Sequence, residues 1–165
     1  QFTLLSAGDV LRLAPDVTLS VLSPDSARSA HEAADNRRSL VMRLDAGNSS
    51  AILPADVDSI VEADLAAWDD RMDVDLIKTP HHGARSSTSE ALLAMTTPGA
   101  CVISSGRRNP YGHPAPEVLT RLAAHRIAVY NTSNDGTITF AAHDEDWRQV
   151  QDRAVVLARR WKLIS

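Results

Sequence analysis

Apolar residues along this chain gather in short runs that end at polar loops, and helical periodicity appears between the runs after residue 50. The runs predict strands at Val17–Leu22, Ser39–Leu44, Ser50–Leu53, Val74–Thr79, Ala100–Ser104, Ala128–Tyr130 and Thr137–Ala142. The periodic stretches predict helices at Ser59–Ala67, Ser89–Met95, Pro116–Ala124 and Glu145–Trp161. Alternation of strand and helix predicts an α/β fold, whereas the strand-rich beginning of the chain predicts antiparallel pairing.

Three further predictions concern individual segments. Asn134-Asp135-Gly136 predicts a hairpin turn that joins the last two strands. The stretch from Asp25 to Arg38 is polar and rich in Ala, which predicts a loop. The apolar side of the last predicted helix, which includes Trp147 and Val150, is expected to pack on the core.

Composition indicates one globular unit. Hydrophobic residues make up 44% of the 165 residues and charged residues 23%, which is enough to build a substantial core. No apolar run approaches the roughly 18 residues that a membrane-spanning helix needs. Cys101 is the single cysteine, so an intrachain disulfide is impossible, and its apolar strand predicts a place in the core.

The most informative loop is Thr79-Pro80-His81-His82-Gly83, which continues through Ala84 and Arg85 to Ser86 and Ser87. It follows a predicted strand and precedes a predicted helix. Rigid elements on both sides aim the side chains of such a loop, so a histidine pair here suits metal or phosphate chemistry. The alternative is a surface turn that happens to contain two histidines.

Two other loops have the same position between a strand and a helix. Asp56 follows Ser50–Leu53, and its carboxylate together with imidazole would suit Zn or Mn. Alternatively, Asp56 or Asp58 serves only as the N-cap of the next helix. The segment Asn109-Pro110-Tyr111-Gly112-His113-Pro114 alone is typical of a turn with a solvent-facing histidine. Together, the three loops are expected to converge at one edge of the sheet.

In this order and spacing, Asp56, His81-His82-Gly83 with Ser86-Ser87, and Asn109 to Pro114 followed by Glu117 resemble a known family. It is the carboxyl-terminal metallo-β-lactamase-type domain of the ComEC competence proteins, which form DNA-uptake channels. The resemblance runs from about Leu11 to Phe140. Two positions depart from the family pattern: Ala55 stands where the family usually has Gly, and Ala84 where it usually has Ser.

The resemblance implies an αββα metallo-β-lactamase-like sandwich, of which this chain holds only the carboxyl-terminal half. The His-x-His-x-Asp-His loop that supplies the first metal ligands of that fold is absent, and the chain begins at Gln1 without Met. We therefore expect residues 1–165 to be the C-terminal part of a domain cut from a larger membrane protein. Its partner would be the membrane channel portion of that parent, with this domain on the extracytoplasmic side.

The implied mechanism is phosphodiester hydrolysis of DNA by a metal-activated hydroxide. Asp56 would bridge two divalent metals, and His82 would bind one of them. The resemblance implies catalytic roles for His81 and His113, with His81 contacting a phosphate or protonating the leaving oxygen. Asn36 occupies the place of another metal-binding histidine in related hydrolases. Substrate contacts are expected from Asn36, Arg85, Ser86, Arg107, Arg108, Asn109 and Tyr111.

Charge gives a mixed indication about nucleic acid. The net charge of −4 argues against a nucleic-acid binder, yet Arg37-Arg38, Arg85 and Arg107-Arg108 all flank the loops above. Guanidinium groups there would hold phosphate oxygens bidentately. The alternative is that they are ordinary surface arginines.

Three functions remain open from the sequence. The first is a metal-dependent nuclease of DNA uptake that degrades the strand not transported, with only half of its site in this chain. The second is a domain that grips DNA or a pilus partner without cleaving it. The third is another phosphodiesterase of the same fold, such as a choline-phosphate esterase. In the first case the isolated chain should bind metal weakly and be inactive.

Overall fold

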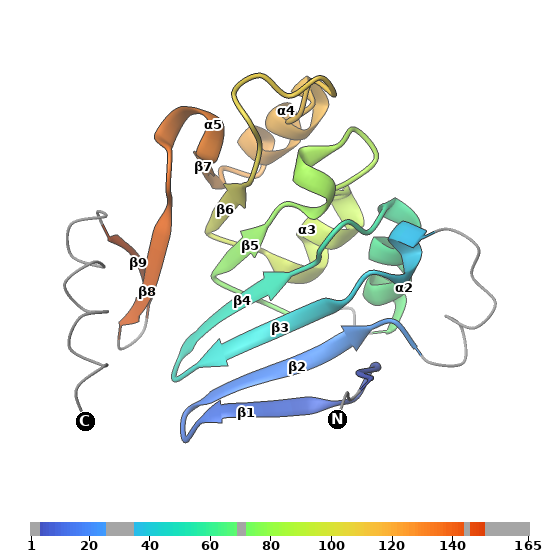
Figure 1. Ribbon diagram of the computed structural model, residues 1–165, viewed down its shortest axis with the longest axis vertical. Coiled ribbons are helices and arrows are strands. Elements are labelled where there is room, and N and C mark those ends of the chain that lie inside the picture. The colour runs from blue at the N-terminus through green and yellow to red at the C-terminus, as the bar shows by residue number, and fades with distance from the viewer. Residues whose placement is uncertain (1–3, 26–34, 69–71, 144–145, 151–165) are drawn as a thin grey trace.

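A seven-stranded mixed sheet organises the chain (Figure 1). The computed structural model describes residues 4–25, 35–68, 72–143 and 146–150. The strands lie in chain order, and β1 to β4 are antiparallel whereas β4 to β7 are parallel. Their bounds are β1 Val10–Ala14, β2 Val17–Ser23, β3 Val41–Ala46, β4 Ser49–Leu53, β5 Leu76–Lys78, β6 Ala100–Ile103 and β7 Ala128–Asn131. The expected mixed α/β class, with an antiparallel beginning, is confirmed.

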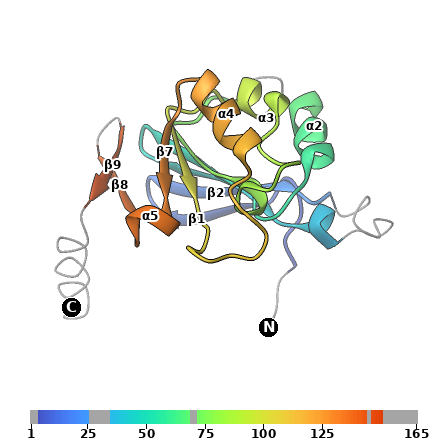
Figure 2. The same ribbon diagram turned by 90° about the horizontal axis from the view of Figure 1, so that it is seen from above.

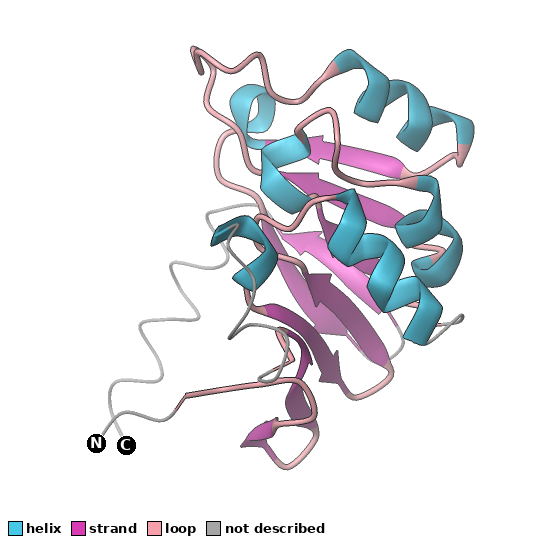
Figure 3. Cartoon of the chain, turned by 90° about the vertical axis from the view of Figure 1, so that its right-hand side faces the viewer, coloured by secondary structure: helices cyan, strands magenta, loops and turns pink. Residues whose placement is uncertain are grey.

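Helices α2 (Ser59–Trp68), α3 (Glu90–Thr96) and α4 (Pro116–Ala124) connect the parallel strands. Parallel neighbours need such crossover connections, because the chain must return to the same end of the sheet. All three helices cover one face of the sheet (Figures 2 and 3).

The core lies between the sheet and these helices. Ile52, Ile77 and Cys101 are register partners on neighbouring strands, and all three are almost fully buried. The helices contribute Leu92, Leu93, Val118 and Leu122. Cys101 is a core residue as expected, and burial raises the pKa of its thiol to about 12, against a smaller opposing effect of Lys78. The thiol is therefore neutral and unreactive at neutral pH.

A buried carboxylate ties the helical layer together. Glu62 in α2 accepts hydrogen bonds from the backbone N–H groups of Thr88 (2.7 Å) and Ser89 (2.6 Å) just before α3. From α4, Arg121 donates to the carbonyl oxygens of Ser87 and Thr88 at 3.1 and 2.7 Å. Burial raises the pKa of Glu62, although the hydrogen bonds and the charge of Arg121 oppose this effect.

The structure corrects the predictions for the last part of the chain. Asp146–Val150, expected to begin a helix, forms strand β9, which pairs with β8 (Thr139–His143) in a separate two-stranded sheet. The i, i+3 spacing of Trp147 and Val150 imitates a helical face, but cross-strand pairing with β8 overrides it. Residues 151–161 of that predicted helix lie outside the described residues.

The predicted Asn134-Asp135-Gly136 hairpin is also wrong. Thr132–Asp135 forms a single turn of helix, α5, and Gly136 ends it at φ 74°. Strands β7 and β8 belong to different sheets, so no hairpin joins them. The Asx chemistry of this segment serves the helix start instead, because Asn131 accepts a hydrogen bond from the N–H of Ser133.

Two differences concern the beginning of the chain. The edge strand β1 had no sequence prediction, because its apolar residues are largely exposed and its pattern is short. In the predicted loop from Asp25 to Arg38, residues 35–38 form the 3-10 helix η1 (Asp35–Arg38), and residues 26–34 lie outside the described residues. Among the described helices, none has the length and apolar character needed to cross a membrane.

Candidate functional site

The three polar loops follow β4, β5 and β6 and meet at the carboxyl edge of the parallel strands. The N–H of His81 donates to the carbonyl oxygen of Ala55 at 3.0 Å, which joins the second loop to the first. The N–H of Ala115 donates to the carbonyl oxygen of Gly83 at 2.8 Å, which joins the third loop to the second. The convergence expected from the strand order is therefore observed.

The first loop has two aspartates with different roles. Asp58 is the N-cap of α2, because its Oδ1 accepts from the N–H groups of Ile60 (3.0 Å) and Val61 (3.3 Å). Its Oδ2 accepts from Arg37 at 3.1 Å. Burial alone would raise the pKa of Asp58, but these hydrogen bonds outweigh it and the pKa is lowered. Since Asp58 caps the helix, Asp56 remains available at the edge of the sheet.

The second loop holds the histidine pair in a tight turn. His81 (φ 46°) and His82 (φ 57°) of η2 (Pro80–Gly83) both have left-handed backbones, which cost energy for residues other than Gly. The buried Ser87 hydroxyl stabilises the turn, since it is within hydrogen-bonding distance of the carbonyl oxygens of Pro80 (2.9 Å) and Ala84 (2.8 Å). Strain that is held by surrounding contacts is typical of functional sites.

The turn places His82 beside Asp56. His82 Nε2 lies 3.7 Å from Asp56 Oδ1, and about half of each side chain is exposed. On the other side of the ring, His82 Nδ1 lies 2.7 Å from the carbonyl oxygen of Ser104. A carbonyl only accepts, so Nδ1 carries the proton and Nε2 is the ring nitrogen nearer Asp56. Protein ligands of zinc commonly show this arrangement of an imidazole fixed by a backbone carbonyl.

The donor set fits one part of a metal site. A nitrogen and an oxygen that each lie about 2.0–2.2 Å from zinc are at most about 4.3 Å apart, so the observed separation is compatible with a shared cation. Zinc takes about four ligands, however. Within the described part of the chain, no group of three or more His, Cys, Asp or Glu side chains gathers to hold a metal. In a metal site, Asp56 and His82 would therefore supply only two ligands of a larger set.

His81 and His113 lie next to this pair. The ring centroid of His81 is 6.5 Å from that of His82 and 6.0 Å from that of His113, both edge to face. Burial lowers the pKa of His113, and the charges of His81 and His82 lower it further. At neutral pH His113 is therefore an uncharged hydrogen-bonding group. Its Nδ1 is buried without a hydrogen-bond partner among the described residues.

The third loop is held by Asn109. Its side-chain nitrogen donates to the carbonyl oxygens of Gly106 (2.8 Å) and His113 (2.7 Å), and its Oδ1 accepts from the N–H of His113 (2.8 Å). Asn109 is expected to contact substrate, and in the structure its side-chain amide forms hydrogen bonds within its own loop. Tyr111, at the outer end of this loop, is 78% exposed, and its ring stacks on His113 with centroids 5.9 Å apart.

The structure gives the expected substrate-binding residues different surroundings. Arg85 forms an ion pair with Glu117 at 3.2 Å, and Arg107 Nε donates to the carbonyl oxygen of Ser133 at 2.9 Å. Ser86 and Arg108 are exposed. Asn36 is exposed in η1, which the ion pair of Arg37 with Asp58 joins to the start of α2.

Lys78 is a charged residue of this region that the sequence analysis did not single out. It alternates with the buried Ile77 and therefore lies on the sheet face opposite the helices. Its ammonium donates to the carbonyl oxygen of Thr79 at 3.0 Å. Burial lowers the pKa of Lys78, and the charge of Asp56 opposes this effect. The sequence signal that could have identified Lys78 is a single lysine in the apolar strand that precedes the histidines.

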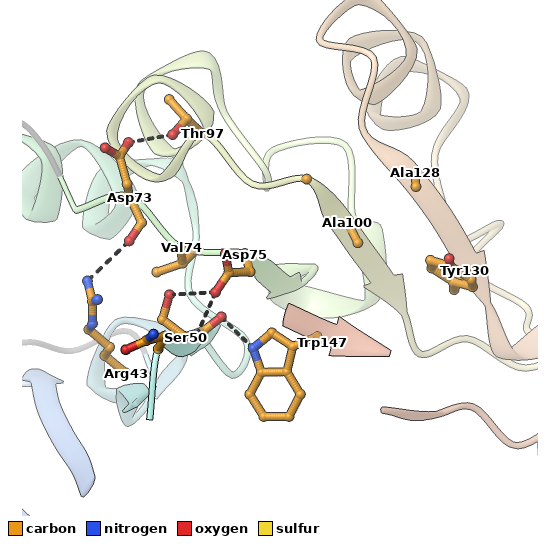
Figure 4. Close-up of a pocket in the computed structure, with 12 residues that line it drawn as sticks. Arg43, Ser50, Asp73, Val74, Asp75, Thr97, Ala100, Ala128, Tyr130 and Trp147 are labelled. Atoms are coloured by element: carbon orange, nitrogen blue, oxygen red, sulfur yellow. Dashed lines mark hydrogen bonds between the residues drawn. The ribbon is translucent and has the colours of Figure 1, made fainter. Parts of the chain in front are cut away.

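A hollow of about 690 Å³ lies at the opposite, amino edge of the parallel strands (Figure 4). Its polar groups already bind one another. The N–H and hydroxyl of Ser50 donate to Asp75 at 2.7 and 3.1 Å, and Trp147 Nε1 donates to the carbonyl oxygen of Ser50 at 2.8 Å. The bond from Trp147 attaches β9 to the amino end of β4 in the seven-stranded sheet. The hollow is separate from the histidine loops.

Similar proteins come from competence systems. The chain is 35% identical to ComE operon protein 3 of Bacillus subtilis over 133 residues, which are 81% of this chain and 17% of that protein. It is 38% identical to Recombination protein 2 of Haemophilus influenzae over 105 residues (64% of this chain, 13% of that protein). Identity to competence protein ComA of Neisseria gonorrhoeae is 32% over 107 residues (64% and 16%). The chain thus spans less than a fifth of these relatives. No protein-family model matches it.

A solved structure supports the fold. A crystal structure from Parabacteroides distasonis, named "Putative metal-dependent hydrolase", superposes with a TM-score of 0.50 at 14% identity. The match covers 81% of this chain and 58% of that one. At this identity the likeness concerns the arrangement of strands and helices alone.

Proposed function

The chain is homologous to one region of the ComEC family of competence proteins, and we propose that it forms the carboxyl-terminal half of a metal-dependent phosphodiesterase domain that cleaves DNA during uptake. The observation that carries this proposal is the pair His82 and Asp56. A backbone carbonyl fixes the tautomer of His82, and its free nitrogen is directed at an exposed carboxylate 3.7 Å away. Such pairing is typical of metal ligands rather than of surface turns.

In this proposal Asp56 and His82 hold a divalent cation, Zn or Mn, together with ligands from another part of the parent protein. A bound cation would supply Lewis acidity and a lowered pKa for water. His81, whose ring lies between those of His82 and His113, would contact the phosphate or give a proton to the leaving oxygen. His113, uncharged at neutral pH, would orient the phosphate by a hydrogen bond.

The parent would be a membrane protein whose channel portion lies outside this chain, with the present domain on its extracytoplasmic side. Two observations support this context. The relatives are several times longer than the matched region, and two of their names refer to competence or recombination. The expected products are fragments of the strand that is not transported.

The test compares two neighbouring aspartates in the parent domain. Asp56→Asn should lower cleavage of DNA with Mn or Zn by more than about a hundredfold, because an amide is a poor metal ligand. Asp58→Asn makes the same chemical change two residues away and keeps an N-cap, so it should leave cleavage nearly unchanged. His113→Ala should lower cleavage less than Asp56→Asn does. Equal rates for the two Asn variants would contradict the site assignment.

The other two functions give different results in the same assay. A domain that grips DNA without cleaving it would bind DNA while showing no hydrolysis in either metal. An esterase for small phosphodiesters would hydrolyse a choline-phosphate ester in an Asp56-dependent way and leave DNA intact. Either result would replace the nuclease by the corresponding alternative.

A further inference from the structure

Tyr111 is placed in a way that the fold does not require. Its side chain is 78% exposed, although aromatic rings of this size usually bury much of their surface. No described core residue depends on it, since it lies outside the hydrophobic cluster between sheet and helices. One face of the ring stacks on His113 at an interplanar angle of 20°, and most of the remaining surface is open to solvent.

The loop holds this ring ready for a ligand. Asn109 bonds the two ends of the loop to each other through Gly106 and His113, and Tyr111 lies between these fixed points. The next residue, Gly112, has φ 67°, a left-handed conformation that closes the turn at little cost for Gly. A loop that is held in place before binding loses little conformational entropy when a partner stacks on the ring that it carries.

The ring also begins a row of aromatic rings that leads to the candidate metal ligands. From Tyr111 the row passes to His113, His81 and His82, with centroid separations of 5.9, 6.0 and 6.5 Å. His82 in turn lies beside Asp56. A group that stacks on Tyr111 therefore lies at one end of a row of rings whose other end is beside Asp56.

The chemistry of the neighbouring residues favours a nucleobase. Arg107 and Arg108 lie in the same loop, so cationic groups accompany the aromatic platform. Aromatic rings with adjacent cations bind single-stranded nucleic acid, because every base offers a face for stacking and the cations attract the phosphates. In a duplex both faces of an internal base are already covered by its neighbours. A stacking platform therefore prefers an unpaired strand.

We propose that Tyr111 is a stacking platform for one base of a single-stranded DNA substrate, and that it confers a preference for single strands over duplex. This inference rests on the proposed function, because it assumes that the same loops receive DNA. It adds to that function a specific contact and a preferred form of the substrate.

The experiment measures binding of a labelled single-stranded oligonucleotide to this chain by fluorescence anisotropy in the presence of a chelator. Tyr111→Ala should weaken binding roughly five- to hundredfold, the range found for loss of one stacked base. Tyr111→Phe should bind like the wild type, since stacking needs the ring and not the hydroxyl. Leu119→Ala, which removes another exposed apolar side chain, should also bind like the wild type. Duplex binding should not respond to any of these changes.

A set of oligonucleotides with one abasic position separates stacking from phosphate contacts. One abasic position should weaken wild-type binding and have no effect on Tyr111→Ala. The inference is overturned if Tyr111→Phe loses as much affinity as Tyr111→Ala, if both proteins respond equally to abasic positions, or if the wild type shows no binding. Asp56-dependent cleavage by the parent domain is measured separately, so the proposed nuclease function can survive each of these results.

Discussion

Gly83 lies directly against Pro114, and this contact joins the histidine loop to the loop that carries His113. A Cβ atom built on Gly83 would stand 2.9 Å from the Cβ of Pro114 and 3.2 Å from its Cα. The same glycine has φ 80° and accepts a hydrogen bond from the N–H of Ala115. The two loops, which follow different strands, therefore lie too close together for a side chain at position 83.

The first prediction follows from this approach. Gly83→Ala should destabilise the protein by about 1–3 kcal/mol more than Gly112→Ala, because overpacking adds to the backbone strain. Both glycines have left-handed backbones, so both variants carry a strain of about 1–2 kcal/mol. Only Gly83 has neighbours within 4 Å of the added Cβ. Urea unfolding of the two variants measures the difference, and equal free energies would mean that the loops can separate freely.

The second prediction concerns Ala55, which stands where the resembling family usually has Gly. Its φ of 49° shows that the turn keeps the left-handed conformation despite the side chain. Ala55→Gly should therefore stabilise the protein by about 1 kcal/mol, as relief of strain exceeds the greater entropy of the unfolded chain. Ala84→Gly is the matched control, because Ala84 has φ −59° and should lose stability on replacement. Thermal unfolding of both variants tests the difference in sign.

The sequence predicted the convergence of the three loops better than it predicted the end of the chain. Asp56, His82 and His113 follow consecutive strands, and parallel order alone brings their loops to one edge. The sequence could not show which aspartate caps α2, since Asp56 and Asp58 both suit an N-cap and only the hydrogen bonds of Asp58 decide it. It also could not show that Asn109 holds its own loop, because an amide serves a turn and a ligand equally well.

The errors at the end of the chain have a common cause. Trp147 reaches across to the carbonyl oxygen of Ser50, 97 residues earlier, and β9 pairs with β8. Local periodicity contains no information about such distant partners, and strand formation depends on them more than helix formation does. The Asn134-Asp135-Gly136 signal failed similarly, because β7 ends the seven-stranded sheet while β8 pairs with the later strand β9 in a separate sheet.

The third prediction concerns metal binding by this chain alone. Two ligands hold zinc weakly, so the purified chain should contain little metal, and zinc should be removed by dialysis against a chelator. The weak binding that remains in titration calorimetry should be lost in His82→Ala. His125→Ala is the control, because His125 forms a second histidine–carboxylate pair, with Glu90, away from the site. Stoichiometric zinc that survives the chelator, or loss of binding in the control instead, would contradict the assignment of a half site at Asp56 and His82.

The fourth prediction is a pH dependence of stability that originates at Glu62. Burial raises the pKa of this carboxyl group above its ordinary value of 4.5, so the folded protein holds the proton to a higher pH than the unfolded chain does. Between these two pKa values, rising pH ionises the group in the unfolded chain first, and the free energy of unfolding falls. Glu62 therefore stabilises the fold most below pH 4.5, and its contribution decreases as the pH rises through the raised pKa.

Glu62→Gln removes this titration while keeping a side chain of the same length. The difference in unfolding free energy between wild type and variant should be constant below about pH 4.5 and should shift in favour of the variant as the pH rises. The variant also loses part of the acceptor for the N–H groups of Thr88 and Ser89, which lowers its stability by a constant amount at every pH. The change of this free-energy difference with pH, and not its constant part, therefore reports the titration of the buried carboxyl group. Urea unfolding at a series of pH values measures the unfolding free energies of both proteins. A difference between them that is the same at every pH would show that Glu62 titrates alike in the folded and unfolded protein.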